Sequence, residues 1–253
     1  MIKGVVLAGG IGSRLLPLTR VTNKHVLPVY DKPMIFYPIR TLVSAGVVDV
    51  LIVTGCASAA DFSHLLGDGH DLGLKRLQYA YQEGEGGIAD ALRLAEKFAG
   101  GDKICVILGD NIIGGSIAPA RESFERQKGA KILLKEVADP ERFGVPEFHN
   151  GRIVRIEEKP KRPKSRYAVT GIYFYDGTVF DRIRRLRPSA RGEYEITDVN
   201  NSYIADDKLT YDVLEGWWTD AGTFESLWHA GSLVREKVMR QAEVTAASGM
   251  GGR

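Results

Sequence analysis

Continuous apolar runs and amphipathic stretches alternate along the first half of the chain. Residues 2–7, 47–54 and 103–108 are almost entirely apolar, which is typical of strands buried on both faces of a sheet. Before the last of these runs, apolar side chains recur at positions 88, 91, 92, 95 and 98, the spacing of one face of a helix. Strands that alternate with helices predict an α/β fold, with a doubly wound, mostly parallel sheet covered on both faces.

The second half of the chain is richer in strand patterns. A turn signal at Asn150-Gly151 lies between two of them and predicts a hairpin. We find no linker or repeat, so we expect one domain over residues 1–240, with parts at about 1–128 and 129–222, and a disordered tail at 241–253. Besides the three runs above, we expect strands at 74–81, 130–137, 143–148, 152–157, 167–175 and 208–214, and helices at 34–46, 57–66, 88–98, 178–186, 196–204 and 223–239.

The composition excludes several classes of protein. The 253 residues carry a net charge of only +2, which favours neither nucleic acid nor an anionic membrane as a partner. No run approaches the ~18–20 apolar residues of a membrane span, and we find no signal-peptide pattern, so we expect a cytoplasmic protein. Cys56 and Cys105 lie in apolar runs, where buried thiols are expected. We expect Trp217, Trp218 and Trp228 in the core or in a pocket wall.

A glycine-rich loop with the sequence L-A-G-G-I-G-S-R follows the first apolar run, at residues 7–14. Glycines leave backbone N–H groups accessible and allow positive φ, so the loop can wrap an anion. Arg14 adds a fork of donors suited to phosphate. The loop is not the dinucleotide fingerprint, because Leu15 stands where its third glycine belongs, and the P-loop string is absent. The alternative is a glycine turn beside a solvated arginine.

Several charged residues follow strand-like runs. Asp110 and Asp220 do so at positions where open α/β sheets bind ligands. Two such carboxylates can hold one Mg²⁺ against phosphate oxygens, although a lone Asp is more often a helix cap or a surface residue. Lys24 lies between two prolines and could neutralise a reacting phosphate, and Lys159 is held by a following proline. The five histidines are scattered, so we assign them no metal or nucleophilic role.

The chain resembles the glucose-1-phosphate thymidylyltransferases, a family of sugar-1-phosphate nucleotidyltransferases. Residues 7–15 are similar to the family signature L-A-G-G-x-G-[ST]-R-L, and residues 29–35 read V-Y-D-K-P-M-I. The resemblance covers about residues 2–235. Further segments that resemble the family, in the same order, lie at residues 108–112, 156–160, 168–175 and 191–200.

The resemblance implies a Rossmann-like fold of the nucleotide-diphospho-sugar transferase type, with a β-rich sugar-binding insertion. It implies that glucose 1-phosphate attacks the α-phosphorus of dTTP in line, without a covalent enzyme intermediate, and that dTDP-glucose and pyrophosphate form with Mg²⁺ as cofactor. The implied partners are these small molecules, and a homo-oligomer is left open. The chain ends soon after its last predicted helix, so it resembles the short form, without the regulatory nucleotide site that longer members build from extra C-terminal helices.

The family pattern also implies roles for individual residues. The implied catalytic residues are Arg14, Lys24, Asp110 and Asp220, and the two aspartates are also the implied metal ligands. The implied nucleotide-binding residues are Leu7, Gly9, Gly10, Gly12, Ser13, Arg14, Gln82, Gly87 and Asp110. The implied sugar-phosphate-binding residues are Asn111, Gly144, Glu158, Lys159 and Val169.

Departures from the family pattern keep other functions open. The base loop, commonly Q-P-x-P-x-G-L-A, reads Q-E-G-E-G-G-I-A at residues 82–89, and Phe143 replaces a common tyrosine. The common S-K-Q is Asn23-Lys24-His25, which keeps the lysine. The alternatives are the same chemistry with UTP or another sugar 1-phosphate, and a non-catalytic regulatory protein that binds a sugar nucleotide.

Overall fold

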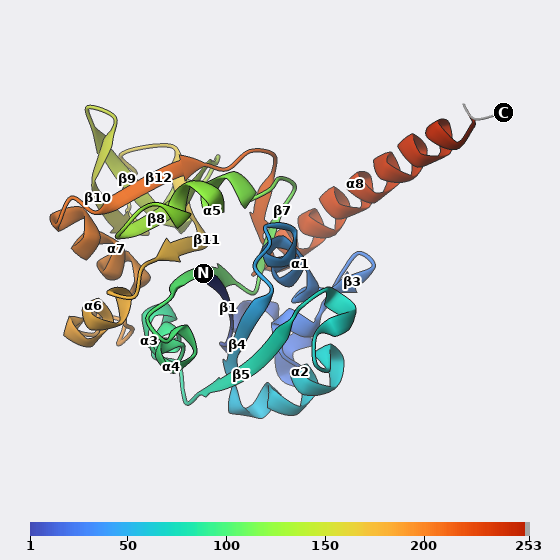
Figure 1. Cartoon of the computed structure of the whole chain (residues 1–253), viewed down its shortest axis with the longest axis horizontal. Helices are drawn as coiled ribbons and strands as arrows, with labels where there is room; N and C mark the ends of the chain where they lie inside the picture. Colours follow the sequence, from blue (N-terminus) through green and yellow to red (C-terminus); the bar gives the residue numbers. More distant parts are fainter. Residues whose placement is uncertain (251–253) are drawn as a thin grey trace.

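A seven-stranded sheet runs through the centre of the computed structural model, which describes residues 1–250 and the side chains of residues 1–243 (Figure 1). Its strands, in spatial order, are β12 (Leu209–Val213), β8 (Ala130–Glu136), β11 (Tyr167–Tyr175), β6 (Lys103–Leu108), β1 (Ile2–Ala8), β4 (Asp49–Gly55) and β5 (Arg76–Gln82). β11 is antiparallel to both of its neighbours, and the other four pairings are parallel. The predicted α/β fold with a mostly parallel sheet is confirmed.

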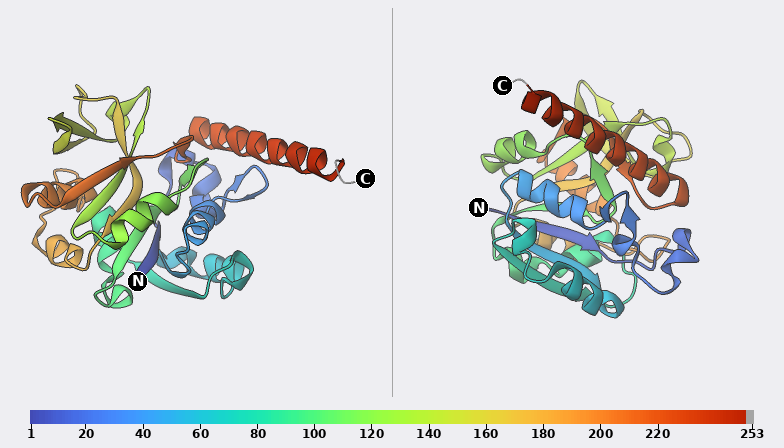
Figure 2. Two further views of the ribbon diagram at one scale, coloured as in Figure 1. Left: turned by 45° about the horizontal axis from the view of Figure 1, so that its top comes forward. Right: turned by 90° about the vertical axis from the view of Figure 1, so that its right-hand side faces the viewer.

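Helices cover both faces of the sheet (Figure 2). One face packs against α3 (Ile88–Arg93), α4 (Glu96–Ala99), α6 (Val179–Arg185) and α7 (Ile196–Ala205), and the other against α1 (Phe36–Ser44), α2 (Ala59–Leu66) and α5 (Ala118–Glu125). In β1, Val5 and Leu7 belong to the first core, whereas Val6 and Ala8 belong to the second. Burial on both faces therefore explains the unbroken apolar run that predicted this strand.

Three two-stranded pairs lie beside the main sheet. They are β2 (Pro28–Val29) with β3 (Lys32–Pro33), β7 (Asn111–Ile113) with β13 (Trp218–Asp220), and β9 (Gly144–His149) with β10 (Arg152–Glu158). Asn150 and Gly151 join the last pair with φ of 49° and 75°, as the predicted hairpin turn requires. The register of β7 with β13 sets Asp220 opposite Asn111, which joins two segments far apart in the sequence.

Some elements differ from the sequence prediction. The helix expected at 88–98 divides into α3 and α4, because the N–H groups of Leu94 and Ala95 donate three residues back instead of four. The helix expected at 34–46 begins at Phe36, since Met34 and Ile35 form a turn between β3 and the helix. α5 was not predicted, because Ala120 and Phe124 are its only buried side chains. Cys56 is exposed, and its predicted burial is wrong, because β4 ends one residue earlier.

α8 (Phe224–Met250) projects from the body of the molecule (Figures 1 and 2). Its Ala230 and Val234 pack against Val29 and Met34. Trp228 is 75% exposed, so the expected core or pocket position is wrong for this tryptophan. The helix continues beyond residue 240, where we expected a disordered tail to begin, and residues 251–253 of that expected tail lie outside the described residues. None of the described helices is long and apolar enough to cross a membrane.

Truncation of Phe124 tests the packing of the helix that the sequence did not predict. Phe124 is fully buried, and its ring lies 5.6 Å from that of Phe174. We expect Phe124→Ala to lower the free energy of unfolding by about 3–5 kcal/mol, through lost burial and the cavity left behind. Urea denaturation measures this change, and the exposed Val154→Ala is the control, expected within about 0.5 kcal/mol of the parent. Equal stability of the two variants would contradict the packing described.

Candidate active site

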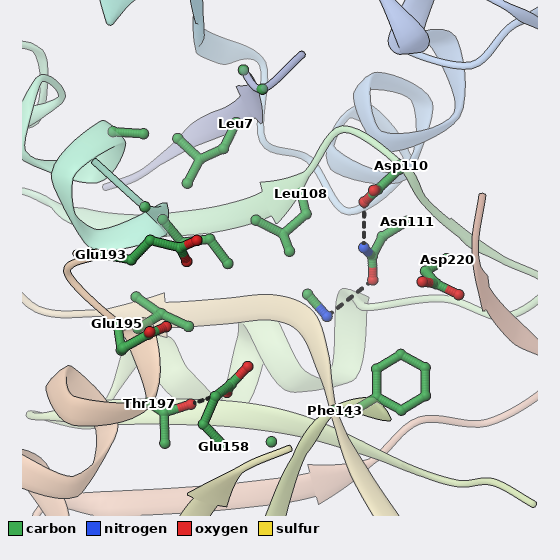
Figure 3. A pocket seen from close by; sticks show the side chains of 18 of the residues that line it. Leu7, Leu108, Asp110, Asn111, Phe143, Glu158, Glu193, Glu195, Thr197 and Asp220 are labelled. Atoms are coloured by element: carbon green, nitrogen blue, oxygen red, sulfur yellow. Dashed lines mark hydrogen bonds between the residues drawn. The ribbon is translucent and has the colours of Figure 1, made fainter. Parts of the chain in front are cut away.

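A cavity of about 660 Å³ opens at the carboxyl ends of β1 and β6 (Figure 3). Its walls come from the glycine-rich loop after β1, the loop after β5, the β9–β10 hairpin, and strands β11 and β13. Of the predicted site residues, Gly12 alone is outside the lining. The others that line the cavity are Leu7, Gly9, Gly10, Ser13, Arg14, Lys24, Gln82, Gly87, Asp110, Asn111, Gly144, Glu158, Lys159, Val169 and Asp220.

The glycine-rich loop has the backbone that its sequence predicts. Gly10 and Gly12 have φ of +88° and +66°, a region that favours glycine. A Cβ on Gly12 would lie 2.9 Å from the side chain of Thr19, so this residue shapes the loop without lining the cavity. Arg14 reaches toward the end of β13, where its Nη2 lies 3.0 Å from the place of a Cβ on Gly222. The loop thus brings Gly9, Gly10, Ser13 and the guanidinium of Arg14 to one side of the cavity.

Asp110 is buried at the end of β6 and is paired with Lys24. The Lys24 Nζ lies 2.6 Å from Asp110 Oδ2, and the Asn111 Nδ2 donates to Asp110 Oδ1 at 3.0 Å. Burial by itself would raise the pKa of Asp110, but the ammonium of Lys24 and these hydrogen bonds hold that pKa well below its ordinary value. Asp110 is therefore an anion at neutral pH. Lys24 also lines the cavity, so an anionic ligand bound there could contact its ammonium group.

Asp220 lies near Asp110, although 110 residues separate the two in the sequence (Figure 3). Burial, and after it the charge of Asp110, raises the pKa of Asp220 to about 6. Arg142 opposes this shift, with its Nη2 3.3 Å from both carboxylate oxygens. An ionised Asp110 beside an Asp220 whose charge it disfavours is a fitting place for a hard cation, which would take its remaining ligands from phosphate and water. Among the described residues, no three His, Cys, Asp or Glu side chains cluster as a metal site.

The base loop is braced by a segment more than a hundred residues away. Gly87 has a φ of +91°, and a Cβ there would lie 2.8 Å from the backbone oxygen of Tyr194. The Tyr194 N–H donates to the Gly86 carbonyl at 2.8 Å, and the Ala89 N–H donates to the Tyr194 carbonyl at 3.1 Å. These backbone contacts fix the shape of the loop that carries Gly87 into the cavity.

The wall of the cavity formed by β10, β11 and α7 carries polar groups suited to a sugar phosphate. Thr197 donates to Glu158 at 2.6 Å (Figure 3), and Glu158, an acceptor-only side chain, suits sugar hydroxyls. Asn111 Oδ1 accepts from the backbone N–H of Gly171 and from Trp218 Nε1, which fixes this wall to the strand end. Lys159 has a φ of +46°, and its half-exposed side chain stands at the rim of the cavity.

Sequence reasoning missed several residues of the cavity. His25 is fully buried, and burial followed by the charge of Lys24 lowers its pKa to about 3, so the ring is neutral. Its Nδ1 lies 2.7 Å from Asn23 Oδ1. The proximity of His25 to the predicted Lys24 was the only signal, and Arg142 carried none. The other lining residues not predicted include Glu85, Phe143, Tyr173, Arg191, Glu193, Glu195 and Thr197, and the last five of these lie in segments that resemble the family. Trp218 lies in the cavity wall, as expected.

Comparison with known proteins assigns the chain to a family. Residues 3–237 match the sequence model described as nucleotidyl transferase. The chain belongs to the nucleotidyl transferase family. This nucleotidyl transferase is 47% identical to a glucose-1-phosphate thymidylyltransferase of Neisseria meningitidis over 239 residues, which cover 92% of the chain and 83% of the relative. It is also 47% identical to one of Mycolicibacterium smegmatis over 244 residues, covering 95% and 84% of the two chains.

Solved structures agree with this assignment. A Bacillus anthracis protein assigned as a glucose-1-phosphate thymidylyltransferase, crystallised with sucrose, is 52% identical and superimposes with a TM-score of 0.89, over 93% of this chain and 96% of that one. A UDP-glucose pyrophosphorylase in complex with UDP-glucose, 24% identical, has a TM-score of 0.82 over 94% of this chain and 100% of that one, which shows a shared fold. The resemblance of the sequence to the glucose-1-phosphate thymidylyltransferases is confirmed.

The raised pKa of Asp220 predicts a pH-dependent stability. Its folded-state pKa of about 6 lies above the ordinary 3.8, so between these values the folded protein binds more protons than the unfolded chain, and the Asp220 contribution to stability falls as pH rises. Above pH ~6 and without divalent cations, we expect Asp220→Asn to be more stable than the parent by up to roughly 2–3 kcal/mol.

Thermal unfolding in a chelating buffer across the pH range measures this difference. The gain should be largest near neutral pH and fade at about pH 3 and below, where Asp220 is mostly protonated in both states of the parent. The exposed Asp207→Asn is the matched control. A variant that is less stable than the parent at neutral pH would show that the pair with Arg142 outweighs the repulsion from Asp110.

Proposed function

We propose that this nucleotidyl transferase joins dTTP and glucose 1-phosphate to give dTDP-glucose and pyrophosphate. The observation that carries the proposal is the position of Lys24, Asp110 and Asp220. They lie between the glycine-rich loop and the wall of the cavity that carries Glu158 and Lys159. The names of its relatives support the choice of substrates. A protein that only binds a sugar nucleotide would not need all three charged groups in one place.

The arrangement supports a direct transfer. In this proposal the base lies beside Gln82 and Gly87, the triphosphate lies along the glycine-rich loop with Arg14, and the sugar lies against Glu158 with its phosphate near Lys159. The sugar-phosphate oxygen is already anionic, so no general base is needed. Its bond to the α-phosphorus forms as the bond to pyrophosphate breaks, and pyrophosphate leaves with the electron pair. Lys24 neutralises charge at the reacting phosphate, so catalysis consists of positioning and electrostatic stabilisation.

Asp110 and Asp220 would hold Mg²⁺ in this scheme. Their adjacent, partly repelling carboxylates fit a divalent cation, and Mg²⁺ prefers a carboxylate or two together with phosphate oxygens. The bound ion supplies additional positive charge to the phosphates. Arg142 would then move its guanidinium away from Asp220 or share that carboxylate, since both oxygens are within its reach.

The proposed partners are small molecules alone. The net charge of +2 favours no nucleic acid. The substrates are metabolites of the cell interior, and neither cysteine is paired in a disulfide, which supports work in a reducing cytoplasm.

Pyrophosphate release across a panel of substrates tests the proposal. We expect the highest turnover with dTTP and glucose 1-phosphate when dTTP, UTP, CTP, ATP and GTP are crossed with the 1-phosphates of glucose, N-acetylglucosamine and galactose. Asp110→Asn should lower kcat by at least about 10²-fold, because it removes a charge at the reacting centre. Asp207→Asn, an exposed carboxylate outside the cavity, is the matched control. Preference for another pair would reassign the substrates, and nucleotide binding without turnover would favour a regulatory protein.

Removal of Lys159 tests which phosphate it contacts. We expect Lys159→Ala to raise the KM for glucose 1-phosphate by about 10–100-fold through loss of a charge-assisted contact. The KM for dTTP should stay close to that of the parent. Lys161→Ala, a substitution of an exposed lysine in the same loop, controls for the loss of positive charge. An equal rise in both KM values would contradict a contact confined to the sugar phosphate.

A further inference from the structure

The side-chain amide of Gln82 is held in one orientation by a neighbouring helix. Gln82 Nε2 donates to Asp90 Oδ2 at 2.8 Å and to the Gly87 carbonyl at 3.4 Å. Both partners are acceptors, and an ionised carboxylate can only accept, so the amide nitrogen must face them. The amide oxygen is therefore turned the other way, toward Gly9, where a Cβ would lie 3.2 Å from Oε1. Gln82 is 8% exposed and lines the cavity.

Asp90 is itself fixed in place. Its Oδ1 accepts from Arg93 Nη2 at 2.7 Å, one turn further along α3, and its side chain is 14% exposed. Gly86 leaves the room that this carboxylate occupies, because a Cβ there would lie 2.5 Å from Asp90 Oδ2. Asp90 does not line the cavity. It therefore acts on a ligand only through Gln82.

The orientation of the amide decides which bases it can accept. Thymine and uracil carry an N3–H donor between two carbonyl oxygens, whereas cytosine carries an N3 acceptor beside an amino group. An amide oxygen that faces the cavity can receive the N3–H of thymine or uracil. Opposite cytosine N3, the same oxygen would set two acceptors against each other and leave both without a hydrogen. If the amide were free to turn, its N–H could serve cytosine, and this discrimination would be lost.

We propose that Asp90 is a positioning residue that locks the Gln82 amide with its oxygen toward the base, and so selects thymine or uracil over cytosine. The inference rests on the proposed function, because it requires the base of the nucleotide to lie beside Gln82. It assigns a specificity role to a helix residue that contacts neither substrate. The same device leaves the choice between thymine and uracil to the contact with a single methyl group.

Asp90→Asn tests the inference with little change of shape. An asparagine can offer either its oxygen or its nitrogen to Gln82, so only the longer contact to the Gly87 carbonyl would still hold the amide nitrogen, and the Gln82 amide can turn more easily. We expect the preference for dTTP over dCTP, measured as the ratio of their dissociation constants by calorimetry on the full chain with Mg²⁺, to fall by about tenfold or more. The KM for dTTP should rise while kcat with dTTP stays within about threefold of the parent, because Asp90 is remote from the reacting atoms.

Glu83→Gln is the matched control, because it removes one negative charge from an exposed side chain next to Gln82 in the base loop. The control should keep the dTTP-to-dCTP ratio of the parent. An equal loss of discrimination in Glu83→Gln would attribute the effect to charge and overturn the inference. An unchanged ratio in a folded Asp90→Asn would overturn it as well, and would leave the proposed function intact.

Two further measurements keep the outcome decisive. If Asp90→Asn does not fold, Gly86→Ala displaces the carboxylate of Asp90 without changing its charge, and the same loss of discrimination is expected. The parent protein is measured first, with dTTP, UTP and dCTP. A parent that turns over neither dTTP nor UTP would refute the proposed function and the inference with it, whereas a parent that binds dCTP as tightly as dTTP would refute the inference alone.

Discussion

The buried ion pair between Lys24 and Asp110 is the constraint on which the arrangement of the site depends. A carboxylate at the end of a central strand is almost completely removed from water, and it stays charged only if cations and donors surround it. Lys24 supplies the charge from the loop after β1, and Asn111 supplies a donor from the next residue of the chain. Because Asn111 also accepts from Gly171 and Trp218, one buried charge orders the strand end, β11 and β13 together.

Other charged side chains of the cavity, outside the Lys24–Asp110 pair, are only partly neutralised by their neighbours. Burial and the nearby charge of Asp110 raise the pKa of Asp220, and Arg142 offsets only part of this shift. Arg14 and Lys159 stand at the edges of the cavity, where anionic ligands would enter. A site that is to receive several phosphates and a cation needs opposed charges that are already in position. Charged groups that are already placed need not reorganise during the reaction. The sheet and the braced base loop provide that rigidity.

Much of the fold was predictable because local patterns and tertiary contacts agree. The strands at 103–108 and 167–175 coincide with β6 and β11, and the Asn150-Gly151 turn joins the expected hairpin. Prediction failed where one element depends on another. The helix at 88–98 divides although its apolar spacing is regular, and α5 forms although only two of its side chains are buried. The motifs located the candidate site well, but Arg142 gave no signal, because it meets Asp220 only in the folded chain, and His25 was marked only by its place beside Lys24.

The sequence by itself determined the alternation of strands and helices, the glycine-rich loop with its positive φ angles, and the identity of the carboxylates and lysines at the strand ends. These features are local, since they follow from side-chain periodicity and from the backbone freedom of glycine. Only the tertiary structure decided which charges meet. The register of β7 with β13 places Asp220 beside the end of β6, and the start of α3 turns Asp90 toward Gln82. The pKa of Asp220 and the orientation of the Gln82 amide depend on atoms a few ångströms away in space, which spacing along the chain does not specify.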